Sequence, residues 1–391
     1  MRPASLIRVP LLCFLLCVAS LTARASEFEL ITQTPAGAKA LRLGGVPAIR
    51  MTGMIVTGDA DKLRALLEKI AADTKPKPGE PLTFMEMSSM GGTLDEGFQI
   101  GTLMRKYRVI AIVRQHDFCM SSCAFAFLGG NAHRPSSPYP TECNLEIGGK
   151  VAFHNFFLNR AAIREGTSED PVASRMQGFA DARGGAAMLV RYAGDMGMAP
   201  NFVASLMGRP VEDFQYIETV GQFLSFHVCP IGLDRPTAAL DVQAKNVCVN
   251  SLGKLPEGKP KVTPMTAAQA KLYMLQRMQD NMQASKAKGR LAAQIASATR
   301  SKDEIDKLYD DLSAAGMALP EIMGPTFEIG TELDGGYEPA CYVSLSAEEP
   351  DKFDIVVQGP RGFTSPPHDP PQNARRLFLY SRDDVINPRP H

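Results

Sequence analysis

The chain has 391 residues, which is long enough for more than one folded domain, and its 45% hydrophobic content excludes a largely disordered protein. Its 42 basic residues are balanced by 42 acidic ones. A near-neutral chain lacks the basic surface on which nucleic-acid binding depends, so we expect no nucleic-acid partner.

Residues 1–25 have the pattern of a secretory signal peptide. Arg2 and Arg8 flank an apolar run over residues 9–21, and residues 23–25 form a small-x-small cleavage site. The run is too short to span a bilayer comfortably, so a retained membrane anchor is the weaker alternative. Cleavage predicts a periplasmic or secreted chain without an integral membrane anchor, in which 39 basic residues face 42 acidic ones once three arginines are removed.

Six cysteines remain in the mature chain, and an even number in an exported protein indicates disulfides. Cys229 and Cys248 are the preferred pair, because they flank a loop containing Pro230, Gly232 and Pro236. The sequence does not fix the other pairings. A zinc site is the alternative, but no spacing of Cys or His residues supports it. The remaining cysteines are Cys119, Cys123, Cys143 and Cys341.

Strand and helix signals alternate between residues 48 and 113. Apolar residues recur at helical spacing between the strand candidates, and polar N-cap residues precede the first helix. This order predicts a parallel sheet covered by helices, in which sites form at the carboxyl ends of the strands. Strands are expected at residues 48–56, 82–87 and 109–113, with helices around Leu63, Leu66, Leu67 and Ile70 and around Leu94, Phe98, Ile100, Leu103 and Met104.

The mature chain divides into three expected regions. Residues 26–255 form the α/β domain, and residues 256–320 form a helical hairpin that opens at Thr263-Pro264. Residues 321–391 form a small β-rich region, because Gly and Pro clusters separate short strand candidates. Its Pro-rich tail after Ser365 is expected to be poorly ordered. The strand candidates there are residues 326–333, 340–345, 353–358 and 376–380.

The segment from Ser88 to Phe157 collects the groups that acyl transfer requires. The Gly91-Gly92 turn can donate backbone N–H groups, Ser121 precedes a short helix, and His154 ends a strand. A serine hydroxyl is a weak nucleophile until a base takes its proton, and a helix N-terminus stabilises developing negative charge. Taken singly, each group also has an ordinary structural role as a turn, an N-cap or a core histidine.

This segment resembles the Clp protease proteolytic subunit and its relatives in the ClpP/crotonase superfamily. Residues 89–92, Ser-Met-Gly-Gly, are similar to the family's Ser-Pro-Gly-Gly turn. Residues 121–125, Ser-Ser-Cys-Ala-Phe, are similar to its Ser-Met-Gly-Ala-Phe nucleophile segment, and Arg134 and residues 135–140 precede the strand that ends in His154. The resemblance covers residues 45–230. It implies an α/β fold with a ClpP/crotonase-like repeated β-β-α core and a parallel sheet, to which the C-terminal helical hairpin and small β-rich appendage are added.

The resemblance makes Ser121 the nucleophile and His154 its general base. It assigns the oxyanion donors to the backbone N–H groups of Gly92 and Ser122. The family's catalytic aspartate is most nearly matched by Asp213, with Glu212 left open beside it and Asp195 a distant third. The implied activity is that of an exported serine hydrolase, most simply a peptidase, which acts on a peptide or other acyl substrate without a cofactor. Homo-oligomers are also implied, because the superfamily commonly forms trimers or stacked rings.

Several departures and alternatives remain. Met90 replaces the proline of the family turn, and an insertion around residues 141–143 lengthens the path to the histidine. Ser122 is a rival nucleophile, and Lys150 could act in a serine–lysine dyad. Cys119 or Cys123 could be a thiolate nucleophile, although an oxidising compartment favours disulfides. A non-catalytic binding or scaffold protein that has lost a functional triad is the other class of function.

Overall fold

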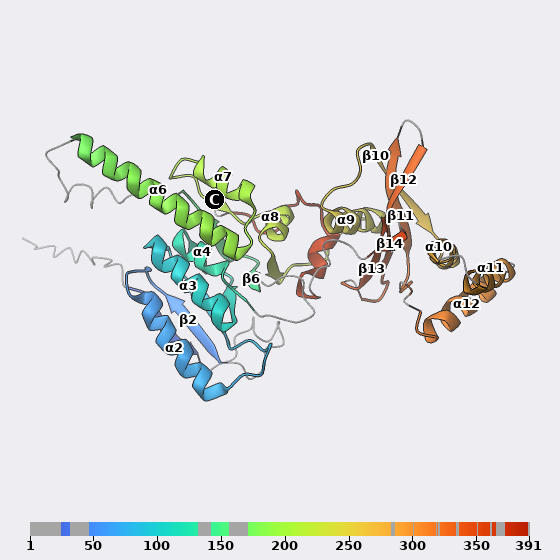
Figure 1. The fold of residues 1–391 in the computed structure, drawn as a ribbon, viewed down its shortest axis with the longest axis horizontal. Helices are drawn as coiled ribbons and strands as arrows, with labels where there is room; N and C mark the ends of the chain where they lie inside the picture. The colour runs from blue at the N-terminus through green and yellow to red at the C-terminus, as the bar shows by residue number, and fades with distance from the viewer. Residues whose placement is uncertain are drawn as a thin grey trace, which may run out of the picture.

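The computed structural model describes residues 25–31, 47–131, 142–155, 171–282, 286–299, 301–317, 319, 321–333, 336–349, 351–359, 362–364 and 372–389. The signal-peptide prediction (apart from Ala25), Arg134 and residues 135–140 lie outside the described residues. Figure 1 shows two parts, with the blue-to-green N-terminal elements on one side and the orange C-terminal elements on the other.

The centre of the N-terminal part is a sheet of six strands, β1 (Glu27–Ile31), β2 (Ala48–Thr52), β3 (Thr83–Ser88), β4 (Val109–Val113), β6 (Cys143–Glu146) and β9 (Val228–Ile231). They lie side by side in that order, and every neighbouring pair except β1 and β2 is parallel. The predicted α/β class with a parallel sheet is confirmed. The strand predicted over residues 48–56 corresponds to β2, which ends earlier, at Thr52. It ends there because Gly53 leaves the extended conformation with φ 92°.

Two helices, α2 (Asp59–Thr74) and α3 (Leu94–Tyr107), make the crossovers of this sheet. Their apolar faces are buried where the sequence predicts, for example at Leu63 and Ile100. Glu96 ties the two helix starts together, because its carboxylate accepts hydrogen bonds from the N–H groups of Gly58 and Ala60, both at 2.9 Å. A carboxylate at a helix N-terminus satisfies donors that the helix itself leaves unpaired. Glu96 therefore holds the loop before α2 beside the start of α3.

A second sheet, of three strands, contains part of the Ser88–Phe157 segment. It contains β5 (Phe118–Met120), β7 (Lys150–Phe153) and β8 (Gln215–Tyr216), and the short helix α4 (Ser122–Phe127) follows β5. The first two strands are parallel, with Cys119 opposite Val151 and Met120 opposite Ala152. Ser89 connects this sheet to the end of β3, because its backbone pairs with that of Cys119. The carboxyl ends of β5 and β7 therefore lie near the carboxyl end of β3 in the main sheet.

The described residues of this part also form α6 (Pro171–Met196), α7 (Pro200–Met207), α8 (Val220–Ser225) and α9 (Leu240–Leu252). The end of α6 packs on the core through Leu189 and Tyr192, whereas its beginning projects outward (Figure 1). Val172, Met176 and Phe179 are 62%, 70% and 66% exposed there and fall on one helical face. No helix in the described ranges is long and apolar enough to cross a membrane.

The C-terminal part is built on an antiparallel sheet of β10 (Lys259–Met265), β11 (Thr326–Leu333), β12 (Gly336–Leu345), β13 (Phe353–Gly359) and β14 (Gly362–Thr364). The strand β10 contains Thr263 and Pro264, so the helix start predicted there is wrong. An edge strand tolerates Pro260 and Pro264, because only one side of it must pair. The helices that follow are α10 (Ala267–Asn281), α11 (Lys286–Ala298) and α12 (Lys302–Ala314), so the described chain has three helices where a hairpin of two was predicted.

The end of the chain returns to the N-terminal part. A 3₁₀ helix, η1 (Gln372–Leu379), packs on α9 and β9 through Leu377, Phe378 and Leu379. The predicted strand at residues 376–380 is therefore wrong, because a run of consecutive apolar residues cannot distinguish a strand from a buried helical turn. The expected disorder is wrong for residues 372–389 as well. The N–H groups of Val220 and Gly221 donate to the carbonyl groups of Asp384 (3.0 Å) and Arg382 (2.7 Å), so this backbone is paired.

Asn387 anchors this returning segment and provides a test of it. The residue is 1% exposed, accepts a hydrogen bond from the Gly148 N–H (2.9 Å) and donates to the Gly149 carbonyl (2.9 Å). Asn387→Ala is expected to lower the free energy of unfolding by about 1–3 kcal/mol, because it leaves these backbone groups without partners. Urea denaturation measures this. Asp383→Ala, at an exposed position of the same segment, is the control, and equal stability of the two variants would contradict the anchor.

The described cysteines form two disulfides, Cys119–Cys123 and Cys248–Cys341. The preferred pairing of Cys229 with Cys248 is therefore wrong. Cys248 lies on α9, which packs against β12 and so meets Cys341, whereas Cys229 is buried in β9 of the main sheet. Closeness in sequence around a Pro-rich loop gives no information on which face of a helix a cysteine occupies. The disulfide links the last helix of the N-terminal part to the C-terminal sheet.

Candidate functional site

Ser121 occupies a sharp turn between β5 and α4. Its dihedral angles are φ 56° and ψ −126°, a region that costs a non-glycine residue about 1–3 kcal/mol. Backbone bonds hold it there, because its N–H donates to the Ala152 carbonyl (2.9 Å) and its carbonyl accepts from the Ala124 N–H (3.0 Å). A serine in a strained strand-to-helix turn is typical of activated nucleophiles, since the turn presents the hydroxyl at the end of the sheet.

Gly91 makes room for this turn. A Cβ atom on Gly91 would lie 2.6 Å from the Met120 carbonyl oxygen, 2.7 Å from the Ser121 Cβ and 3.0 Å from the Ser122 nitrogen. Its φ of 92° is a second reason for glycine at this position. The Gly91 N–H is occupied, because it donates to the Ser89 Oγ (3.0 Å). The Gly91-Gly92 turn and the turn at Ser121 are therefore in direct contact.

Gly92 presents its backbone to solvent. Its φ is 148°, and a Cβ atom there would collide with the Ile55 carbonyl, so only glycine fits. The neighbouring backbone is fixed, because Ile55 accepts from the Thr93 N–H (2.9 Å) and donates to the Gly91 carbonyl (2.9 Å). Within the described residues, neither the Gly92 N–H nor the Ser122 N–H makes a hydrogen bond. Both are donors that an oxyanion can use.

Ser122 differs from Ser121 in burial. It is 0% exposed and lies against α3, where a Cβ on Gly97 would be 2.8 Å from the Ser122 Cβ. Its Oγ is buried and makes no hydrogen bond among the described residues, whereas Ser121 is half-buried at the surface of the site. A substrate carbonyl cannot reach a hydroxyl enclosed between two helices. The geometry therefore favours Ser121 over the rival serine as a nucleophile.

His154 follows β7 and lies at the same end of the three-stranded sheet as Ser121. Met120 of β5 lies opposite Ala152 of β7. Ser121 directly follows Met120, and His154 comes two residues after Ala152. The imidazole is 9% exposed and packs on the Phe214 ring, with the ring centres 4.6 Å apart. Burial lowers its pKa below the ordinary value of 6.5, and hydrogen bonds to the backbone of Asn155 and Val211 partly oppose this. The neutral imidazole, which is the form that can act as a base, is thereby favoured.

The segment that contains the predicted carboxylates also touches His154. Val211 and Phe214 make the contacts described above, while the Asp213 carboxylate pairs with Arg209 at 2.7 Å and is 45% exposed. Glu212 is exposed. The loop that the sequence motif points to therefore contacts His154 through Val211 and Phe214, two residues for which the sequence predicts no role. The aromatic residue directly after Asp213 was the available signal. Asp213 as the third member of the triad stays a prediction.

Lys150 lies at the opposite end of β7 from His154. It is paired with Phe118, three residues before Ser121, and its ammonium group donates to the Pro388 carbonyl (2.5 Å) and the Asn387 Oδ1 (3.4 Å). Burial lowers its pKa, but its hydrogen bonds hold it against the C-terminal segment. These contacts give Lys150 a structural role and do not favour the serine–lysine dyad.

The Cys119–Cys123 disulfide spans the turn at Ser121, with its Cα atoms 5.1 Å apart. A disulfide sulfur cannot act as a thiolate, so neither cysteine is a nucleophile in this oxidised form. The bridge joins the strand before Ser121 to the helix after it and so restricts the turn. Cys143 is a free, buried cysteine, and burial raises the pKa of its thiol to about 12.

Charged side chains fix the loop that leads into β5. Arg50 of β2 makes two hydrogen bonds to the Asp117 carboxylate (2.6 and 2.7 Å) and one to Glu86 of β3 (3.1 Å). Arg114 pairs with Glu86 from the other side and with Glu146 of β6. These charges share partners and form a network with a two-bond Arg50–Asp117 pair, and the network fixes the loop directly before Phe118.

Comparisons with known proteins do not identify a family. No protein-family model matches the chain, and no curated protein matches it.

Proposed function

We propose that this protein is an exported serine hydrolase of the ClpP/crotonase type, most simply a peptidase. The observation that carries the proposal is the strained turn at Ser121, held by Ala152 and enclosed by Gly91. Strain of this kind persists at functional sites because surrounding contacts maintain it. The two disulfides support an exported location, since such bonds persist in oxidising compartments.

The reaction assigns one role to each group. The Ser121 Oγ attacks the acyl carbon while the His154 imidazole accepts its proton, and the carbonyl oxygen becomes an oxyanion. The N–H groups of Gly92 and Ser122 donate to that oxyanion, and each such donor typically contributes about 10²–10³ in rate. His154 then protonates the leaving amine or alcohol as the acyl–serine ester forms. Water, deprotonated by the same imidazole, hydrolyses the ester and regenerates the hydroxyl of Ser121.

Orientation of His154 does not require a charged partner. A carboxylate holds the tautomer of the base in the usual triad, and a backbone carbonyl can do the same without adding charge. Packing of the imidazole on the Phe214 ring supports a fixed orientation of His154, and Asp213 remains the proposed third member if Arg209 releases it. The superfamily's homo-oligomers are proposed here as well, supported by the exposed apolar face of α6.

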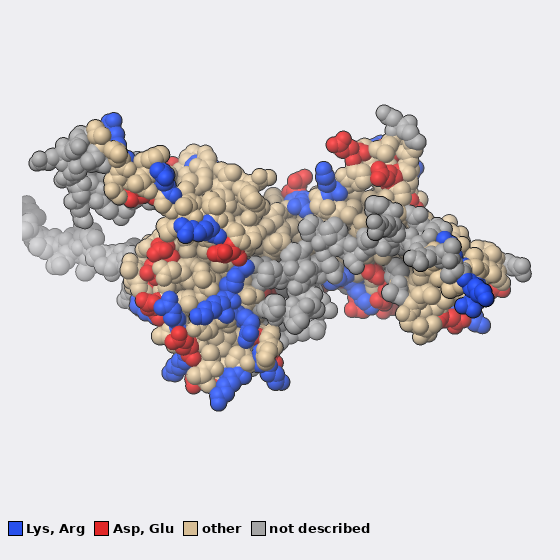
Figure 2. Space-filling model, viewed as in Figure 1, with Lys and Arg blue, Asp and Glu red and all other residues tan. Residues whose placement is uncertain are grey.

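A non-catalytic binding or scaffold protein is the second candidate function. The Asp213–Arg209 pair favours it, because a carboxylate engaged elsewhere is what a lost triad would leave. The charge distribution does not support the scaffold function, because acidic and basic side chains are interspersed over the face drawn in Figure 2. The two candidates differ in one measurable property, the reactivity of the Ser121 hydroxyl.

A fluorophosphonate probe on the mature protein tests the proposal. We expect covalent labelling, with peptide mapping by mass spectrometry placing the phosphonyl group on the peptide that contains Ser121. Heat-denatured protein is the control, because it keeps the serine but loses the turn. Labelling no faster than in the denatured control would favour the scaffold function.

The lowered pKa of His154 predicts the pH dependence of that labelling. The neutral imidazole is the reactive form, so lowering its pKa keeps the site active to a lower pH. Labelling is expected to be constant through neutral pH and to reach half its maximum below pH 6.5. Initial labelling rates over a pH series measure this, and a midpoint above 6.5 would show that burial does not control the base.

A further inference from the structure

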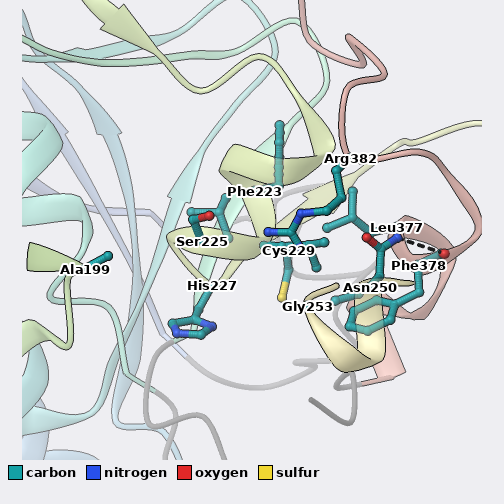
Figure 3. Close-up of a pocket in the computed structure, with 13 residues that line it drawn as sticks. Ala199, Phe223, Ser225, His227, Cys229, Asn250, Gly253, Leu377, Phe378 and Arg382 are labelled. Atoms are coloured by element: carbon teal, nitrogen blue, oxygen red, sulfur yellow. Dashed lines mark hydrogen bonds between the residues drawn. The ribbon is translucent and has the colours of Figure 1, made fainter. Parts of the chain in front are cut away.

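A cavity of about 250 Å³ lies away from Ser121 and His154, between the segment α8–β9 and the returning helix η1. Figure 3 shows its lining, with α9 contributing Asn250, the residue after α9 contributing Gly253, and the C-terminal segment contributing Phe378 and Arg382. It therefore forms only because the end of the chain folds back. Its volume is slightly below the roughly 300–1,000 Å³ range of drug-sized ligand pockets, so it suits a small ligand.

Most of the wall is apolar, which requires a ligand with an apolar body. The residues that provide this surface are Phe223, Leu224, Val228, Ala374, Leu377 and Phe378. A cavity of this kind without polar groups would accept any small hydrocarbon. The wall also contains Ser225, His227 and Cys229, and the selectivity argued here rests on two other polar groups, Asn250 and Arg382.

The first polar group is the side-chain oxygen of Asn250. The residue is 2% exposed, and its Nδ2 donates to the carbonyl groups of Phe378 (3.0 Å) and Tyr380 (2.9 Å). Both amide hydrogens are therefore used, which fixes the side chain with its oxygen on the other side, as Figure 3 shows. Within the described residues this buried oxygen accepts no hydrogen bond. An unsatisfied buried acceptor is costly, so the site favours a ligand with a hydroxyl or N–H donor.

The second polar group is the guanidinium of Arg382. Its backbone is held by the Gly221 N–H, and its half-buried side chain lines the cavity. It makes no ion pair with any carboxylate of the described residues. A cation beside an apolar cavity favours an anion, and a planar guanidinium matches a carboxylate in a two-bond arrangement.

We propose that this cavity binds a small apolar carboxylic acid that also carries a hydroxyl or N–H donor. Arg382 pairs with the carboxylate, the Asn250 oxygen accepts from the donor, and the apolar chain fills the space against Leu377 and Phe378. A medium-chain hydroxy acid or an acylated amino acid has this chemistry. The site does not depend on the proposed hydrolase activity.

Calorimetric titration of the mature protein with three probes tests this. We expect 3-hydroxydecanoate to bind about 3–10-fold more tightly than decanoate, because only the former offers a donor to Asn250. Decane-1,3-diol, which lacks the carboxylate, is expected to bind at least about 10-fold more weakly than 3-hydroxydecanoate. Equal affinities for all three probes, or no binding of the hydroxy acid, would overturn the proposal.

Variants test whether the probes bind in this cavity. Arg382→Gln is expected to weaken the hydroxy acid at least about 10-fold while leaving the diol unchanged. Arg235→Gln removes the same charge at an exposed position and is the matched control. Ala374→Leu fills the cavity and is expected to abolish binding of all three, with thermal unfolding showing that each variant is folded. Ser121→Ala keeps full binding, so failure here and failure of the hydrolase are separate results.

Discussion

Replacing Ser121 with alanine is expected to reduce fluorophosphonate labelling and any acyl hydrolysis at least about 10³-fold, since no other hydroxyl takes the place of a removed nucleophile. The fold is expected to persist. Alanine keeps the backbone bonds to Ala152 and Ala124, and it tolerates φ 56° no worse than serine does. Labelling rates and substrate turnover measure the loss.

Ser122→Ala is the matched control, one residue away. The proposed role of Ser122 uses its backbone N–H, which alanine retains, and its buried Oγ makes no hydrogen bond within the described chain. We therefore expect labelling close to that of the unaltered protein and stability unchanged or slightly raised. If Ser122→Ala abolished labelling while Ser121→Ala did not, the rival assignment of the nucleophile would be correct.

Removing the Cys248–Cys341 disulfide is expected to cause the largest loss of stability, about 2–5 kcal/mol in the free energy of unfolding. The bridge joins residues 93 positions apart, and closing a long loop restricts the unfolded chain strongly. It is also the covalent link between α9 and the C-terminal sheet. Urea denaturation of the double variant Cys248→Ala/Cys341→Ala measures the loss.

The second disulfide provides a contrast. Cys119 and Cys123 are only four positions apart, so Cys119→Ala/Cys123→Ala is expected to lower global stability by less. Its effect is expected mainly on labelling of Ser121, because the bridge spans the nucleophile turn. Equal stability losses for the two pairs would show that loop length does not govern the effect.

The sequence predicted the main α/β architecture well where apolar periodicity was strong. The strand and helix signals between residues 48 and 113 correspond to β2, α2, β3, α3 and β4 in the expected order. Short-range signals around the C-terminal part were weaker. The sequence predicts a helix start at Thr263-Pro264, but both residues lie in an edge strand, and it predicts a strand at residues 376–380, of which 376–379 belong to a buried 3₁₀ helix.

The candidate site was predicted in its parts but not in its geometry. Spacing brought Gly91, Ser121 and His154 to the ends of strands, and the structure adds that β5 and β7 are parallel neighbours. It also distinguishes two adjacent serines by burial, which no sequence pattern does. The long-range contacts were beyond any sequence signal. Cys248 meets Cys341 and Asn387 meets Gly148, because folding back of the C-terminal segment depends on the whole tertiary arrangement.

The sequence by itself determined the residues able to do chemistry and the order of the elements that carry them, because periodicity, caps and glycine turns act over a few residues. Only the tertiary structure decided which of them meet. The positive φ of Ser121, the burial of Ser122, the pairing of Asp213 with Arg209 and the cavity beside Arg382 arise from contacts between distant segments. Such contacts depend on packing in three dimensions, and local sequence preferences do not encode them.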